Sequence, residues 1–168
     1  MLDDIAKTEF VGYTDMKATA KVTAIVKDGA RVEAVETGDD IVFTLDRTSF
    51  YAESGGQVGD TGVITNDSCT IRVLDTTKNA AGVFIHKAVV EEGFLREGDT
   101  VEAVVDVERR RAIMRNHTAA HLLQAALRSV LGDHVEQAGS YTANDHIRFD
   151  FTHFAALTAE ELAKVEDM

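Results

Sequence analysis

The chain has 168 residues, 45% of them hydrophobic and 27% charged, which is the composition of an ordinary globular protein. No apolar run approaches the ~20 residues that span a membrane, and Met1-Leu2-Asp3-Asp4 does not begin a signal peptide, so we expect a cytoplasmic protein without a membrane partner. The net charge of −12 argues against DNA binding and requires a local basic patch for any RNA contact. A single cysteine, Cys69, excludes an internal disulfide and fits a reducing compartment.

The first two thirds of the chain predict an antiparallel β-domain of the sandwich or barrel type. From Lys17 to Asp106, short β-branched runs alternate with period two between glycine turns, and no stretch has helical periodicity. We therefore predict an all-β domain over residues 1–106. Its expected strands cover residues 19–26, 30–36, 40–46, 62–65, 70–75, 82–90 and 100–105.

The periodicity changes at Val107. From there to Leu131 the apolar residues fall at helical spacing, and Gly132 follows where a left-handed C-cap would lie. We expect the apolar side of this helix, with Leu122, Leu123, Ala126 and Leu127, to pack against a core.

Two short strands and a second helix follow. Residues 135–141 and 147–151 predict a hairpin with an Asn-Asp turn pair, and Thr158 with Glu161 predicts the capping box of the next helix. One helix, one hairpin and the start of another helix leave a sheet edge uncovered and too small a core. We expect residues 107–168 to be the truncated first part of an α+β domain.

The predicted helix carries His117 and His121 four residues apart. Residues at this spacing share one helix face, with about 5–6 Å between Cβ atoms, so both imidazoles can reach one metal ion at roughly 2.0–2.1 Å. The alternative is a pair of surface histidines. A zincin protease is disfavoured, because its motif needs a glutamate where this chain has Thr118. The other candidate ligands are His134, His146, His153 and Cys69. None of these shows partner spacing, so we expect the missing ligands after Met168.

A second motif is the fifteen-residue string from Thr48 to Gly62, with Gly55-Gly56-Gln57 at its centre. Its simplest interpretation is a long turn between strands, with glycines at positive φ. It is not a phosphate loop, because such a loop needs a lysine after its last glycine. Gly-Gly-Gln alone is a weak motif, but the whole fifteen-residue string, with aromatic residues on one side, is a highly specific sequence motif.

Two further groups of polar residues are functional candidates. Strand alternation puts Gln137 and Ser140 on opposite faces unless a bulge intervenes, and both could simply be solvent-facing residues. Four of the 17 basic residues lie at the start of the predicted helix, where the helix dipole disfavours arginine and a bound RNA phosphate would offset the mismatch. These candidates for binding an RNA phosphate are Arg109, Arg110, Arg111 and Arg115.

In these motifs the chain resembles the internal editing region of bacterial alanyl-tRNA synthetases. The resemblance covers nearly the whole chain and implies a translation-factor-like β-barrel, followed by the start of an α+β editing domain. Threonyl-tRNA synthetases and free-standing editing proteins share that second domain. The matching stretches are residues 10–13, 50–62, 73–78, 110–111, 116–123, 137–140 and 148–153.

The resemblance also assigns roles to individual residues. The family holds a zinc ion with a His-x-x-x-His pair, matched by His117 and His121, and with a later Cys-x-x-x-His pair that would fall after Met168. The glutamine and serine of the family's editing pocket align with Gln137 and Ser140, which carry over as catalytic residues.

This chain departs from the family's pattern at two positions. Ala120 stands where the family often has a threonine, which puts the polarity of that side of the pocket in doubt. Ser49 replaces the proline of a Thr-Pro-Phe sequence, which we expect to alter only a turn.

By resemblance, the parent enzyme joins alanine to tRNA(Ala) with ATP and magnesium and hydrolyses mischarged seryl- and glycyl-tRNA. A separate hydrolytic site is needed because a pocket for alanine rejects glycine and serine poorly. A difference of one methylene or one hydroxyl gives only about 1–3 kcal/mol of discrimination. We expect residues 1–168 alone to be inactive, since no ATP site is evident and half of the zinc ligands are missing. The alternatives are a free-standing trans-editing hydrolase and a non-catalytic tRNA-docking module.

Overall fold

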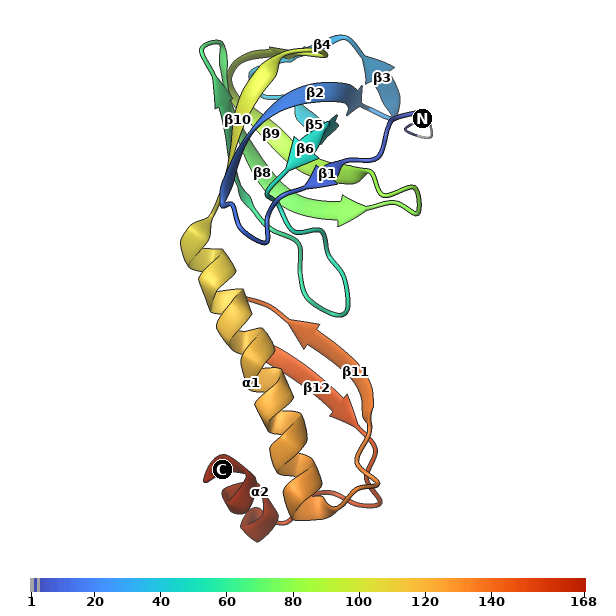
Figure 1. The fold of residues 1–168 in the computed structure, drawn as a ribbon, viewed down its shortest axis with the longest axis vertical. Coiled ribbons are helices and arrows are strands. Elements are labelled where there is room, and N and C mark those ends of the chain that lie inside the picture. Colours follow the sequence, from blue (N-terminus) through green and yellow to red (C-terminus); the bar gives the residue numbers. More distant parts are fainter. Residues whose placement is uncertain (1, 3) are drawn as a thin grey trace. The chain divides into compact units, whose positions relative to one another are not determined.

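The computed structural model describes Leu2 and residues 4–168, and its residues pack into two units. The barrel unit comprises Met1–Ser54 and Gly59–Arg109, and the helix–hairpin unit comprises Gly55–Val58 and Arg110–Met168. The predicted fold class, an antiparallel β-barrel followed by an α+β segment, is confirmed (Figure 1). The predicted domains, 1–106 and 107–168, stay a prediction, because packing units do not establish independent folding. No helix in the described part of the chain is both long and apolar enough to cross a bilayer.

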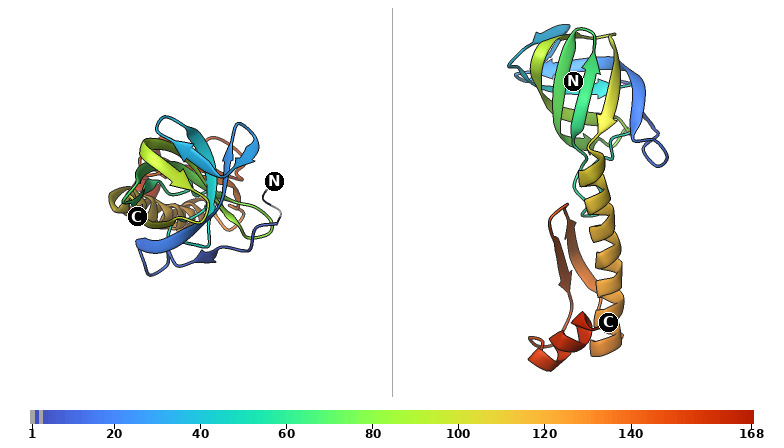
Figure 2. Two further views of the ribbon diagram at one scale, coloured as in Figure 1. Left: turned by 90° about the horizontal axis from the view of Figure 1, so that it is seen from above. Right: turned by 90° about the vertical axis from the view of Figure 1, so that its left-hand side faces the viewer.

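Six of the described strands close into the barrel, which Figure 2 shows from two sides. They are β2 (Lys17–Lys27), β5 (Asp40–Leu45), β7 (Gly62–Asn66), β8 (Cys69–Lys78), β9 (Phe84–Arg96) and β10 (Thr100–Val105). Their order is β10-β7-β8-β9-β5-β2, and the ring closes because β10 pairs antiparallel with both β7 and β2. Six of the predicted strands are therefore confirmed, although β9 extends six residues beyond its expected end. The strand predicted at residues 30–36 is interrupted at Glu33 and forms two short strands with different partners.

Four shorter strands among the described residues of the barrel unit lie outside the six-stranded ring. They are β1 (Glu9–Phe10), β3 (Ala30–Val32), β4 (Ala34–Glu36) and β6 (Arg47–Thr48). The turn from β2 to β3 contains Asp28 and Gly29 with φ of 51° and 76°, as a two-residue hairpin turn with the right twist requires. β4 pairs with the end of β9, and β1 pairs parallel with β6.

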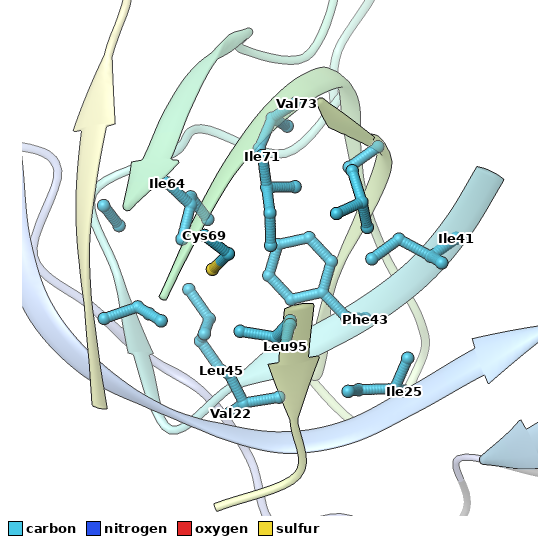
Figure 3. Packing of buried hydrophobic residues seen from close by; sticks show 14 of the residues in the cluster. Val22, Ile25, Ile41, Phe43, Leu45, Ile64, Cys69, Ile71, Val73 and Leu95 are labelled. Carbon is cyan, nitrogen blue, oxygen red and sulfur yellow. The ribbon is translucent and has the colours of Figure 1, made fainter. Parts of the chain in front are cut away.

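Alternating side chains fill the barrel interior. Burial alternates strictly along β10, as expected for a strand with one face inside a small closed barrel. Figure 3 shows Phe43 among the buried side chains, with Ile71 and Leu95 nearby. Cys69 belongs to the same cluster, and burial raises the pKa of its thiol. This cysteine is therefore part of the barrel core.

The helix–hairpin unit holds two helices and a hairpin. The elements are α1 (Val107–Leu131), whose first three residues belong to the barrel unit, β11 (Gln137–Thr142), β12 (Ile147–Phe151) and α2 (Ala159–Glu166). The antiparallel hairpin lies alongside α1 in both side views (Figures 1 and 2). Ile113 and Leu127, fourteen positions apart, are buried on the inner stripe of α1. The expectation that Leu122 packs inward is wrong, because it lies about 140° around the helix from Leu127 and is 66% exposed.

The capping box predicted at Thr158 is confirmed. The Thr158 hydroxyl accepts a hydrogen bond from the Glu161 amide at 3.2 Å, and the Glu161 carboxylate accepts one from the Thr158 amide at 2.8 Å. Replacing Thr158 with alanine should therefore destabilise α2 by about 1 kcal/mol. Hydrogen exchange would show this as faster exchange of the Glu161 amide. The control is Thr118→Ala, which removes a hydroxyl bonded within α1 to Met114 and should leave α2 unchanged.

Candidate metal centre and its support

Two histidines follow one another along one face of α1. His117 and His121 are one helical turn apart, and their ring centroids are separated by 5.1 Å with the rings tilted by 39°. His117 is half-buried and His121 is exposed. Two imidazoles at this separation can converge on one cation, so the geometry suits the predicted role of half a metal site.

The ring of His117 has a specific hydrogen-bond partner. Its Nδ1 lies 2.8 Å from the side-chain oxygen Oε1 of Gln57. An amide oxygen only accepts hydrogen bonds, so Nδ1 carries the proton and donates. The lone pair of the imidazole then resides on Nε2, which is the nitrogen left to bind a metal. Gln57 is only 8% exposed, so this contact is shielded from competing water.

Gln57 reaches His117 because the segment Gly55–Val58 packs within the helix–hairpin unit, although its neighbours in sequence belong to the barrel unit. Gln57 forms a parallel bridge with Thr142 at the end of β11. The Val58 amide donates to the Thr142 carbonyl at 3.1 Å, and the Thr142 amide donates to the Gly56 carbonyl at 2.8 Å. This single bridge and the two hydrogen bonds beside it hold the segment against the end of β11.

The base of the same string is fixed inside the barrel unit. Phe50 is fully buried, the Tyr51 amide donates to the Asp60 carboxylate at 2.7 Å, and the Asp60 amide donates back to the Tyr51 carbonyl at 2.9 Å. The Thr76 hydroxyl donates to the Asp60 carbonyl at 3.0 Å. The fifteen-residue motif is thus an ordered loop whose two ends are joined by the hydrogen bonds between Tyr51 and Asp60.

A bulge in β11 alters the faces predicted for Gln137 and Ser140. The register with β12 shifts at Ala138, so Gln137 pairs with Phe151 and Ser140 pairs with Phe149. The two partners are alternate residues of β12 and share a face, so the bulge brings Gln137 and Ser140 to one face as well. Gln137 is exposed and Ser140 is half-buried.

The glycine segment also contacts Ser140. A Cβ atom added to Gly56 would lie 2.3 Å from the Ser140 carbonyl oxygen and 3.3 Å from the Ser140 Cβ. The segment Gly55–Val58 therefore touches both a predicted metal ligand, His117, and a predicted pocket residue. The string is specific in sequence, but no site residue was predicted within it. Its specificity was the signal that Gly56 and Gln57 serve the site.

The four arginines predicted to bind tRNA differ in exposure. Arg111 and Arg115 are exposed, whereas Arg109 is half-buried and donates to the Gly59 carbonyl at 2.9 Å. Arg110 is buried, with 6% of its surface accessible. Of the four, only Arg111 and Arg115 expose their side chains to solvent, as a contact with phosphate requires.

The other sequence-predicted metal ligands have different surroundings. His134 and His153 contact each other, with Nε2 and Nδ1 2.9 Å apart, and His146 contacts the Asp145 carboxylate at 2.9 Å. Cys69 lies in the barrel core. Across Leu2 and residues 4–168, no group of three or more His, Cys, Asp or Glu side chains is arranged to hold a metal ion. The role of the α1 pair as two of four zinc ligands stays a prediction.

Comparison with known sequences decides the family. Residues 1–109 match the family model described as tRNA synthetases class II (A). The chain belongs to this family. It is 53% identical over 99% of its length to an alanine–tRNA ligase of Acetivibrio thermocellus, and 48% identical over its full length to that of Pelotomaculum thermopropionicum. The alanine–tRNA ligase of Rhodopseudomonas palustris is 50% identical over 99% of the chain.

The resemblance to alanyl-tRNA synthetases noted from the motifs is thereby confirmed. The chain spans only 19% of the length of each of these curated relatives. It corresponds to one region of a class II (A) synthetase. The matches cover the helix–hairpin unit as well as the barrel unit, because they run over nearly all of the chain.

Proposed function

We propose that this chain contributes half of a zinc-dependent editing centre to an alanyl-tRNA synthetase. The observation that carries the proposal is the array of Gln57, His117 and His121, in which a buried acceptor orients the first of two imidazoles on one helix face. The full enzyme would join alanine to tRNA(Ala) with ATP and magnesium, and the editing centre would hydrolyse seryl- and glycyl-tRNA. Because tRNA is its substrate, we place the enzyme in the cytoplasm.

In this proposal His117 and His121 supply two of the zinc ligands, and a Cys-x-x-x-His pair outside the described residues supplies the others. When bound, zinc would provide Lewis-acid chemistry, either by polarising the ester carbonyl or by lowering the pKa of a water molecule. Gln137 and Ser140 would bind the hydroxyl of a misacylated serine or orient the attacking water. Their common face beside the bulge supports a joint role.

The proposed contact with the tRNA backbone uses Arg111 and Arg115. Both are exposed near the start of α1, so their guanidinium groups are free to meet phosphates. The opposing possibility, a docking module without catalysis, would need more of the four arginines to face RNA. A free-standing trans-editing hydrolase is the other alternative, and the match to alanine–tRNA ligases favours the synthetase.

The test uses a full-length alanyl-tRNA synthetase that contains this chain. His117→Ala and His121→Ala should each lower the bound zinc and reduce hydrolysis of seryl-tRNA at least tenfold, since each substitution removes one of the four proposed ligands. The control is His146→Ala, which removes an exposed histidine of the same unit and should change neither quantity. Unaltered hydrolysis in both α1 variants would rule out the proposed centre. Residues 1–168 alone should hydrolyse seryl-tRNA far more slowly than the full enzyme.

A further inference from the structure

The Gly-Gly-Gln string has a role that the proposed function leaves open. Its two glycines and its glutamine lie in an ordered segment of the helix–hairpin unit, and the buried side chain of Gln57 contacts a proposed metal ligand. We infer that Gln57 is a positioning residue that holds His117 in the Nδ1–H tautomer and directs its Nε2 toward the metal. This inference rests on the proposed function for the identity of the metal.

The backbone of Gln57 is held from both sides. The flanking residues Gly56 and Val58 exchange hydrogen bonds with Thr142, so the side chain of Gln57 leaves the segment from a fixed point. Thr142 itself is buried, with 3% of its surface accessible. Lateral movement of the glutamine would therefore break a backbone pairing as well as its bond to the imidazole.

The helix that carries His117 is fastened to the same strand end. The residue before it, Asn116, donates its side-chain amide to the carbonyl of Ala143 at 2.7 Å. Ala143 directly follows Thr142, so adjacent residues at the end of β11 anchor the glutamine segment and α1. The donor and the acceptor of the 2.8 Å bond are thus positioned by one common support.

This arrangement matters because a free imidazole has two neutral tautomers. A metal-ligating histidine usually donates its second ring N–H to a fixed acceptor, which sets both the tautomer and the orientation of the ring. The amide oxygen of Gln57 is such an acceptor, and it is neutral, so it orients the ring without adding a charge to the site. Loss of an acceptor of this kind typically weakens metal binding about 10- to 100-fold.

The first experiment reads the tautomer directly, without metal. Nitrogen NMR of histidine-labelled residues 1–168 at a fixed neutral pH should show His117 protonated at Nδ1. Gln57→Ala should convert it largely to the Nε2–H form that free imidazoles prefer. Gln57→Glu, which retains an acceptor oxygen, should keep the Nδ1–H form.

The second experiment measures affinity for Zn²⁺ in the full-length protein that contains this chain. Gln57→Ala should weaken zinc binding about 10- to 100-fold, and Gln57→Glu should restore most of it. Gln124→Ala is the matched control: it removes another amide–carbonyl contact of the same unit, to Val135 at 3.4 Å, and should leave affinity and tautomer unchanged. A purely structural role for Gln57 would make the two alanine variants equivalent, which would overturn the inference.

The two experiments separate failure of the inference from failure of the proposed function. An Nε2–H tautomer in the unmodified chain, or a tautomer unaffected by Gln57→Ala, overturns the inference whatever happens to zinc. If the unmodified full-length protein binds no zinc, the proposed metal centre is wrong, and the part of the inference that concerns the metal falls with it.

Discussion

Acidification from pH 7 to pH 4 should destabilise the barrel unit by about 3 kcal/mol through one residue, His86. The side chain of His86 is fully buried, with its ring stacked 5.2 Å from Phe43 and edge-on at 5.4 Å to Phe50. Its Nε2 shares a hydrogen bond of 3.0 Å with the Thr48 hydroxyl, and none of these three neighbours is ionisable. Burial in this apolar site lowers the pKa of His86 from 6.5 to about 4.

The sign follows from which state binds more protons. In the unfolded chain His86 is protonated below pH 6.5, whereas in the folded chain it stays neutral down to about pH 4. Between these values the unfolded state takes up the extra proton, so stability is complete above pH 6.5 and falls as the pH is lowered. The difference between 6.5 and about 4, at about 1.4 kcal/mol per pH unit, limits the loss to about 3.5 kcal/mol. About 3 kcal/mol of this is lost at pH 4, where half of the folded molecules have also taken up the proton.

Urea unfolding at several pH values would measure this loss. Carboxylates also contribute to acid destabilisation, so the comparison is with His86→Gln, which cannot titrate and should show a shallower decline between pH 6.5 and pH 4. Should that variant fold poorly, NMR titration of the folded chain gives the same information, because His86 should remain neutral at pH 5. A His86 resonance that titrates near pH 6.5 in the folded protein would contradict the prediction.

Gly56→Ala should destabilise the helix–hairpin unit by about 3 kcal/mol. Gly56 has a φ of 82°, which disfavours any side chain, and an added Cβ would lie 2.3 Å from the Ser140 carbonyl oxygen. The obstructing atoms belong to the backbone of β11, so no side-chain rotation relieves the overlap. We expect the segment to detach from β11, which would remove Gln57 from His117.

Gly55→Ala is the matched control for this substitution. Gly55 also has a positive φ, 59°, but an added Cβ would meet no atom within 4 Å, so only the backbone strain of about 1 kcal/mol remains. Denaturant unfolding would give the two free energies, and hydrogen exchange of the Thr142 amide would report detachment, because this amide donates to Gly56. Equal losses of unfolding free energy in the two variants would contradict the prediction, because they would mean that the backbone of β11 moves to accommodate the added methyl group.

Local patterns in the sequence predicted much of this fold. Alternation along each strand identifies the barrel strands, since the pattern reflects a single buried face. The capping box at Thr158 was equally accessible, because it depends on residues three positions apart. The wrong placement of Leu122 shows the limit of apolar spacing, because a long helix with a narrow buried stripe also carries exposed leucines.

The support of the candidate site could not be predicted from local patterns. The contact between Gln57 and His117 joins residues far apart in the chain, and the bridge to Thr142 depends on two backbones meeting. The bulge at Ala138 was foreseen only as an exception to strand alternation. Pairings of this kind arise from tertiary structure, which alternation and propensity do not encode.

The pairing of Gly55–Val58 with the end of β11 has a consequence for synthesis and for protein engineering. These residues leave the ribosome long before α1, β11 and β12, so their backbone groups stay unpaired until the hairpin forms. Expression of 110–168 alone would produce a hairpin without the segment that pairs with Thr142, and a His117 imidazole without its amide acceptor. Chimaeras between related synthetases should therefore exchange residues 55–58 and 110–168 together, because these two segments form one packing unit.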